Sequence, residues 1–319
     1  MADLINRFHK DVLVVGDDID RALERRGIDI ARDKANIMLL EPETLEDAYR
    51  VEGAAQAPCI VANTADLLPA RLLKSNMEQS PDDLAHAALF AASFAKPQHL
   101  LVEMGPCGLP LDPSSKSSVV ENRDQYAAFT RAFEKQNRIA RQGVYEGVVL
   151  DEDGMMRDEG MLPSGFDAYL LRGFCTIADM KCALSGMRMV SYEPIIAVID
   201  VDDEGNMADK TTLEQAACAM ADLEANVLGI SVACGFDTAI SLAKRLKATA
   251  ETLGFTEEGL PVFVELNIKD KNYPTPDSMV EIGFALRDAG VQFIRAAGDA
   301  TPAYTACLAA ALYGAEVKR

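Results

Sequence analysis

The sequence predicts a single α/β domain in which eight parallel strands, each followed by helical sequence, close into a (β/α)8 barrel. Short apolar runs alternate with amphipathic segments along the 319 residues. The runs are near-continuous rather than strictly alternating, which is typical of parallel strands covered on both faces. Eight such units in one chain favour a closed barrel. An open doubly wound sheet is the alternative, but no GxGxxG motif or P-loop follows the first strand to favour it.

Each strand is predicted where an apolar run, such as DVLVVG or QHLLVEMG, is followed by helical sequence. The predicted strands cover residues 11–16, 57–64, 98–105, 168–173, 193–202, 226–232, 260–268 and 291–298. Helices are predicted at about residues 18–27, 43–53, 81–96, 122–140, 176–187, 212–224 and 236–253, and another begins near Leu67. Any chemistry is expected at the carboxyl ends of the strands, which form the mouth of such a barrel.

Composition narrows the classes of function. The chain carries 50 acidic and 31 basic residues, and its net charge of −19 argues against binding to nucleic acid. The N-terminus has no signal-peptide pattern, and the most apolar stretch, residues 85–95, is shorter than the about 20 residues that cross a bilayer. The seven cysteines are odd in number and form no CxxC pair, so reduced thiols are expected. We therefore expect a cytoplasmic protein that does not act at a membrane.

One segment, residues 143–165, interrupts the alternation of strands and helices. It reads as a small hairpin in which VYEGVVL turns at DEDG. A connection from a helix to the next strand belongs on the N-terminal face of a barrel, opposite the usual active site. We interpret this insertion as a surface loop or as a contact within a homo-oligomer, rather than as a catalytic lid.

Seven segments at the junctions between the predicted elements carry a further pattern. They are VVGDDIDRALERRG (14–27), ANTADLLPARL (62–72), EMGPCGLPLDP (103–113), FDAYLLRGFCTIADMKCAL (166–184), AVIDVDDEGNMADKTTLEQAA (197–217), VELNIKDKNYPTPDSM (264–279) and RAAGDATP (295–302). In order and spacing they resemble the motifs of homocysteine S-methyltransferases, including the first barrel of cobalamin-dependent methionine synthase. The resemblance covers nearly the whole chain and implies one barrel over residues 1–319 with a methyltransferase-like function.

The family that these segments resemble binds Zn²⁺ through three cysteinates. The zinc lowers the pKa of the homocysteine thiol, so that a thiolate can accept a methyl group at neutral pH. The matching positions in this chain are Val232, Ala297 and Gly298, which offer no side-chain ligand. We therefore expect the zinc site of the family to be absent. The alternative is a relocated thiolate site built from cysteines that follow other strands, namely Cys107, Cys175 and Cys234.

A second departure from the family lies at the end of the fourth strand. The family has a glutamate there that can hold the amino group of the substrate, whereas this chain has Arg172. A guanidinium group is suited to a carboxylate or a phosphate, so the expected ligand is small and anionic. The alternative is an internal ion pair between Arg172 and a carboxylate at a neighbouring strand end, namely Asp17, Asp18 or Glu103.

Other polar side chains at strand ends complete the predicted mouth. Glu103 and Glu265 lie inside otherwise apolar strands and are the predicted catalytic residues, because burial can raise the pKa of a carboxyl group into the range of general acid–base chemistry. Ion pairs with Arg172 or Arg295 are their alternative role. The predicted substrate-binding residues are Asp17, Asp18, Asn63, Arg172, Asn267 and Arg295. Four further polar residues stand at strand ends: Asp200, Asp202, Ser231 and Asp299.

Three functions are compatible with these residues. The first is a zinc-free methyltransferase that acts on a small anionic ligand, with a corrinoid or methyl-pterin supplied by a partner protein, since no cobalamin-binding domain is recognised in the sequence. The second is a catalytically inactive barrel that binds a ligand or serves as a scaffold, for which we expect Arg172 and Arg295 in closed salt bridges. The third is homocysteine methylation through the relocated cysteine site.

Overall fold

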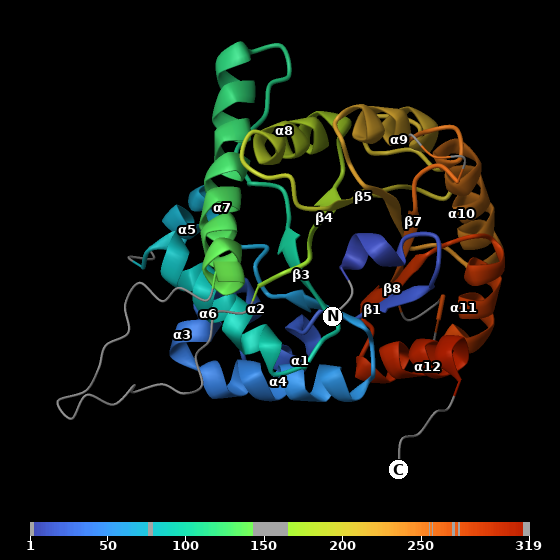
Figure 1. Cartoon of the computed structure of the whole chain (residues 1–319), viewed down its shortest axis with the longest axis horizontal. Helices are drawn as coiled ribbons and strands as arrows, with labels where there is room; N and C mark the ends of the chain where they lie inside the picture. The colour runs from blue at the N-terminus through green and yellow to red at the C-terminus, as the bar shows by residue number, and fades with distance from the viewer. Residues whose placement is uncertain are drawn as a thin grey trace.

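The computed structural model describes residues 3–75, 79–142, 165–254, 256, 258–269, 272–273 and 275–314. Within these ranges the chain forms one closed barrel of eight parallel strands in sequential order, with β1 hydrogen-bonded to both β2 and β8 (Figure 1). The predicted fold class is therefore confirmed. The strands are β1 (Leu13–Val15), β2 (Cys59–Ala62), β3 (His99–Met104), β4 (Ala168–Phe174), β5 (Ile195–Asp200), β6 (Val227–Val232), β7 (Val262–Ile268) and β8 (Phe293–Gly298).

Helices surround the barrel and cover the outer face of the strands (Figure 1). They are α1 (Asp20–Glu24), α2 (Ile30–Asp33), α3 (Ile37–Leu40), α4 (Pro42–Ala54), α5 (Pro69–Lys74), α6 (Pro81–Ser93), α7 (Lys116–Gln142), α8 (Ile177–Arg188), α9 (Leu213–Asp222), α10 (Phe236–Ala250), α11 (Ser278–Asp288) and α12 (Pro302–Tyr313). Many begin at a capping residue that the sequence supplies. Thr212, for example, forms a reciprocal capping box with Gln215 at the start of α9.

The strand interiors alternate between two cores. Residues that point outward pack against the helices, whereas those that point inward fill the lower part of the barrel. The inward set comprises Leu13, Val15, Cys59, Val61, Leu101, Ala168, Leu170, Ile196, Val198, Val227, Phe263 and Phe293. Because side chains alternate along a strand, the next inward position toward the carboxyl end lies two residues further on. That position is polar in seven strands, and in β6 it is Gly229 with Ser231 two residues beyond, so the barrel has an apolar base and a polar mouth.

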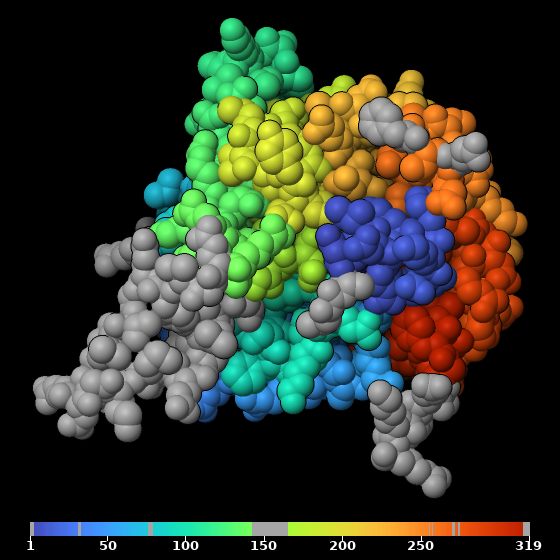
Figure 2. All heavy atoms as spheres, in the orientation of Figure 1, coloured from blue at the N-terminus to red at the C-terminus, as the bar shows by residue number. Residues whose placement is uncertain are grey.

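The base of the barrel is covered by a short 3-10 helix, η1 (Leu4–Arg7). Leu4 is fully buried and belongs to the inner core, and the ring of Phe8 lies edge-on to that of Phe293 at 6.0 Å. Gln292 fixes this segment, because its side-chain amide donates to the carbonyl oxygens of Arg7 and Asp11. Figure 2 shows these first residues, in dark blue, covering the centre of this face.

One segment with a predicted structure lies almost entirely outside the described residues. The hairpin predicted within residues 143–165 lies outside the described residues, except for Gly165. Its proposed part in a homo-oligomer stays a prediction. No helix in the described ranges is long and apolar enough to span a membrane.

Candidate functional site

The mouth of the barrel is lined by one polar side chain from each strand. Each follows the apolar inward residues of its strand toward the carboxyl end. From β1 to β8 they are Asp17, Asn63, Glu103, Arg172, Asp200, Ser231, Glu265 and Arg295. All of them occur among the polar strand-end residues singled out in the sequence. The structure therefore places the predicted catalytic and ligand-binding residues on one face of the barrel, and their contacts define what that face can do.

Glu265 on β7 is the centre of this arrangement. Its side chain is 1% exposed, and its Oε2 atom lies 3.1 Å from Arg295 Nη1 and 3.1 Å from Arg172 Nε. Its Oε1 atom accepts hydrogen bonds from Ser231 Oγ at 2.9 Å and from Arg172 Nη2 at 3.2 Å. Burial alone would raise the pKa of Glu265, but the two guanidinium groups outweigh it and hold the pKa below its ordinary value. Glu265 is therefore an ionised structural anion at neutral pH, whereas a general acid would need a raised pKa.

Arg172 on β4 is engaged by three carboxylates. Besides its two contacts with Glu265, its Nη1 atom lies 3.1 Å from Asp18 Oδ2 and 3.1 Å from Glu103 Oε1. Desolvation would lower the pKa of this guanidinium, but the three negative charges raise it well above its ordinary value. The internal ion pair considered from the sequence is confirmed for Asp18 and Glu103. Arg172 keeps 18% of its side chain exposed, so it is the mouth arginine that solvent can reach.

Arg295 on β8 is more deeply enclosed. Its side chain is 0% exposed, its Nε atom donates to the carbonyl oxygen of Gly16 at 2.9 Å, and its Nη1 atom pairs with Glu265. Its Nη2 atom has no hydrogen-bond partner within the described part of the chain. Arg172 and Arg295 thus share Glu265, and both arginines sit in closed salt bridges, as expected for the second of the three functions.

Two charged residues of the mouth were missed by the sequence analysis. Lys34 Nζ lies 2.6 Å from Asp20 Oδ2, and both residues belong to the long connection between β1 and β2. Desolvation would raise the pKa of Asp18, but Lys34 and Arg172 hold it well below its ordinary value. Burial, with the negative charge of Asp18 as the next cause, raises the pKa of Asp20 to about 7. In the sequence, only the position of the acidic Asp20 shortly after a strand pointed to this part of the mouth. Lys34 gave no such signal, because an amphipathic helical sequence does not show which polar side chain turns toward the barrel.

Asn63 takes part in the architecture of the mouth. Its backbone N–H donates to the hydroxyl of Tyr49 at 2.7 Å, and that hydroxyl donates to the carbonyl oxygen of Val61. Its carboxamide donates to the carbonyl oxygen of Lys34 at 3.4 Å. Tyr49, which is fully buried on α4, is therefore a third residue that sequence reasoning missed, since an apolar helix position predicts only a core side chain.

The positions that match the zinc ligands of the resembled family carry no side chain that could bind a metal. Val232 and Ala297 are buried, and Gly298 has a φ of +75°, which disfavours any side chain. A Cβ atom at Gly298 would also collide with the carboxamide oxygen of Asn267 and lie 2.8 Å from the carbonyl oxygen of Ile268. The residues present therefore do not fit the zinc site of the family.

The cysteines considered as a relocated site lie in different surroundings. Cys107 Sγ donates to Asn122 Oδ1 at 2.9 Å on α7, and Cys234 is buried with a thiol pKa raised to about 11 by desolvation. Cys175 lies exposed at the rim, 3.6 Å from Asp200 Oδ2. Across the described ranges, no three His, Cys, Asp or Glu side chains are grouped so that they could hold a metal ion. Nothing in these contacts favours the relocated thiolate site.

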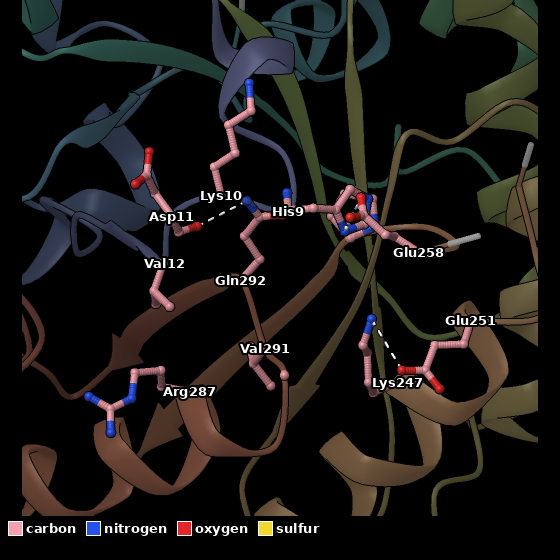
Figure 3. A pocket seen from close by; sticks show the side chains of 12 residues that line it. His9, Lys10, Asp11, Val12, Lys247, Glu251, Glu258, Arg287, Val291 and Gln292 are labelled. Carbon is pink, nitrogen blue, oxygen red and sulfur yellow. Dashed lines mark hydrogen bonds and ion pairs between the residues drawn. The ribbon is translucent and has the colours of Figure 1, made fainter. Parts of the chain in front are cut away.

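The opposite face carries a groove of about 490 Å³ beside the N-terminal segment (Figure 3). Its polar side chains pair largely with one another, because Lys247 Nζ lies 3.5 Å from Glu251 and the side-chain oxygen of Gln292 accepts from the backbone N–H of His9. His9 Nδ1 lies 4.0 Å from Glu258. These contacts hold residues 7–11 against the base of the barrel, and they give this face a structural role.

Comparison with known proteins agrees with the geometry of the barrel. No family model matches the sequence. No curated protein matches it either. Among solved structures, the oxidised form of the homocysteine methyltransferase MmuM from Escherichia coli superposes with a TM-score of 0.67 at 16% identity, over 97% of this chain and 98% of that one. Its metallated form gives a TM-score of 0.65 at 16% identity, over 96% of this chain and 98% of that one. At this identity the likeness shows the fold alone, and the chain shares the barrel fold of these solved structures.

Proposed function

We propose that this chain is a catalytically inactive scaffold barrel, related in fold to the homocysteine methyltransferases, that does not carry out zinc-dependent thiol methylation. The observation that carries the proposal is the position of Glu265, whose carboxylate holds Arg172 and Arg295 together. Both arginines of the mouth are already neutralised by carboxylates. This arrangement favours a role in holding the mouth closed over a role in stabilising charge on a reacting group. The absence of ligand groups at Val232, Ala297 and Gly298 supports the same proposal.

Metal content and activity test this proposal directly. Protein purified without chelators is expected to hold much less than one equivalent of zinc, and Cys234→Ala is expected to leave that content unchanged. Homocysteine methylation from a methyl-sulfonium donor is expected at background level with or without added zinc. Stoichiometric zinc that is lost in Cys234→Ala, or activity abolished by a chelator, would overturn the proposal and restore thiol methylation as the function.

A second candidate is a zinc-free methyltransferase that acts on a small anionic ligand, with a corrinoid or methyl-pterin carried by a partner protein. It is favoured by Arg172, which is partly exposed and whose Nη1 atom is shared between Asp18 and Glu103. An anionic group could take that shared donor and leave the bidentate contact with Glu265 in place.

Calorimetric titration separates the two candidates, with malonate and inorganic phosphate as probes. Binding that is lost in Arg172→Gln but retained in Arg245→Gln would favour the second candidate, because Arg245 pairs with Glu214 at the surface and does not touch the mouth. Binding that both variants retain, or no binding by the wild-type protein, would count against it.

A further inference from the structure

Two buried carboxyl groups influence each other electrostatically at one side of the mouth. Asp17 follows β1 and Glu52 belongs to α4, and they are 3% and 2% exposed. The backbone N–H of Asp17 donates to Glu52 Oε1 at 2.8 Å. A Cβ atom on the neighbouring Gly16 would lie only 2.8 Å from the same oxygen, which shows how closely the Glu52 carboxyl group is packed against this turn.

The hydrogen bonds of Asp17 leave one of its oxygens without a donor. Its Oδ1 atom accepts the backbone N–H of Asp18 at 2.7 Å, whereas Oδ2 has no partner within the described ranges. The charged groups that bear on it are Glu52 from α4, Asp18 from the same turn and Arg295 from β8. Arg295 is already paired with Glu265. An ionised Asp17 would therefore be a buried anion with half of its acceptor capacity unused, which is costly.

A small cavity adjoins this carboxyl group. It has a volume of about 10 Å³ and is lined by Asp17, Asp18 and Glu52, together with residues of α1 and the start of α12. A volume of roughly 10–15 Å³ by this measure accommodates one water molecule. Arg21 and Arg25 line both this cavity and an outer groove of about 500 Å³, so the cavity adjoins solvent at the side of the barrel rather than through the mouth.

We propose that Asp17 and Glu52 hold at least one exchangeable proton between them at neutral pH, with a single water molecule in the adjoining cavity as the hydrogen-bond partner of Asp17 Oδ2. Desolvation, followed by the charge of Glu52, raises the pKa of Asp17 well above its ordinary value, and desolvation also raises that of Glu52. Proton release to solvent would leave a second anion near Arg295. That anion would compete with Glu265 for the guanidinium, so the pair couples pH to the ion pairs of the mouth, whatever ligand the mouth binds.

Residue-resolved NMR titration of the carboxyl carbons tests the proposal on the intact protein. Asp20→Asn serves as the background, because the pKa of Asp20 is raised to about 7 and its titration would overlap. In this background, Asp17 or Glu52 is expected to stay protonated at about pH 7, where an ordinary carboxyl group is ionised. Adding Glu52→Gln removes a neighbouring anion, so the pKa of Asp17 is expected to fall by about one unit or more.

The control is Asp202→Asn, an exposed loop position that should leave the titration of the pair unchanged. Ionisation of both carboxyl groups at about pH 7 in the background protein would overturn the proposal without reference to any further variant. A high-resolution crystal structure is expected to show one water molecule within hydrogen-bonding distance of Asp17 Oδ2. An empty cavity there would overturn that part of the proposal.

Discussion

Glu265 and Arg295 occupy paired positions on β7 and β8, and their charged groups meet at 3.1 Å with side chains 1% and 0% exposed. A buried pair of this kind is energetically asymmetric. Forming it gives little net stability compared with a well-packed apolar pair, but removing one member leaves the other charge buried without compensation. In this barrel, loss of the Glu265 carboxylate would leave two guanidinium groups without their partner, because Arg172 pairs with the same carboxylate.

Glu265→Gln should therefore destabilise the barrel. We expect a loss of about 3–5 kcal/mol in the free energy of unfolding, the usual consequence of breaking a buried ion pair from one side. Urea denaturation followed by circular dichroism measures this. Glu281→Gln is the matched control, since Glu281 is exposed on α11, and it should change stability by less than about 0.5 kcal/mol. Equal effects of the two substitutions would contradict the assigned role of Glu265.

Asp20 should make stability fall as pH rises toward neutrality. Its pKa in the folded protein is raised to about 7, so the folded state binds its proton more tightly than the unfolded chain does. The stabilisation is fully present below about pH 4, the ordinary aspartate range, and is lost as pH rises through about 7. The slope from one proton is at most about 1.4 kcal/mol per pH unit.

Subtraction of the Asp20→Asn curve from the wild-type curve isolates this dependence. The subtraction is needed because Asp17 shifts stability in the same direction, whereas Asp18, whose pKa is lowered, shifts it in the opposite one. Urea unfolding at intervals between about pH 4 and pH 8 provides both curves. Parallel curves would mean that Asp20 titrates normally in the folded protein.

Gly298→Ala should lower the free energy of unfolding by more than the strained backbone conformation alone explains. The residue has a φ of +75°, and the added Cβ atom would also meet Asn267 and the carbonyl oxygen of Ile268. Gly27 has a similar φ of +88° with no atom within 4 Å of the added Cβ, so Gly27→Ala measures the backbone cost by itself. We expect about 1 kcal/mol for Gly27→Ala and a clearly larger loss for Gly298→Ala, by chemical denaturation. A smaller loss at Gly298 would show that space for a side chain exists at this strand end.

Tyr49→Phe should lower the free energy of unfolding, because one hydroxyl group at the mouth loses its hydrogen bonds. The substitution leaves the buried N–H of Asn63 without its acceptor, at an expected cost of about 1–3 kcal/mol. Tyr192→Phe is the control, because Tyr192 is 93% exposed and its hydroxyl group is free to bond to water. Amide hydrogen exchange at Asn63 should accelerate in the first variant only. Unchanged protection there would mean that the N–H finds another acceptor.

The strands could be predicted from the sequence because each one is buried on both faces. The apolar run of the fourth strand, predicted at residues 168–173, corresponds to β4 at Ala168–Phe174. The other predicted strands begin one or two residues before the observed ones, because apolar side chains pack beyond the ends of the hydrogen-bonded ladder. The short helices α2 and α3 were not predicted, since four residues carry too little periodicity to be distinguished from a loop.

The site could be predicted only as a set of positions. Strand ends identify Glu103, Arg172 and Glu265 as neighbours at the mouth, but they do not show which carboxylate an arginine prefers. That choice depends on the register between strands, which pairs Glu265 with Arg295, and on chain that folds back from outside the strands, such as Lys34. The electrostatic state of the mouth therefore depends on contacts that no local pattern encodes.

The cover over the base of the barrel constrains how the chain can be made. Gln292 bonds to the backbone of residues 281 and 285 positions earlier, so the segment around residues 7–11 cannot dock before Gln292 has been made. Strand closure has the same requirement, because β1 pairs with β8. Contacts of such sequence separation form slowly. During synthesis the apolar ring of Phe8 is therefore expected to stay available to chaperones until β8 has been translated, and the barrel is expected to close only after that point.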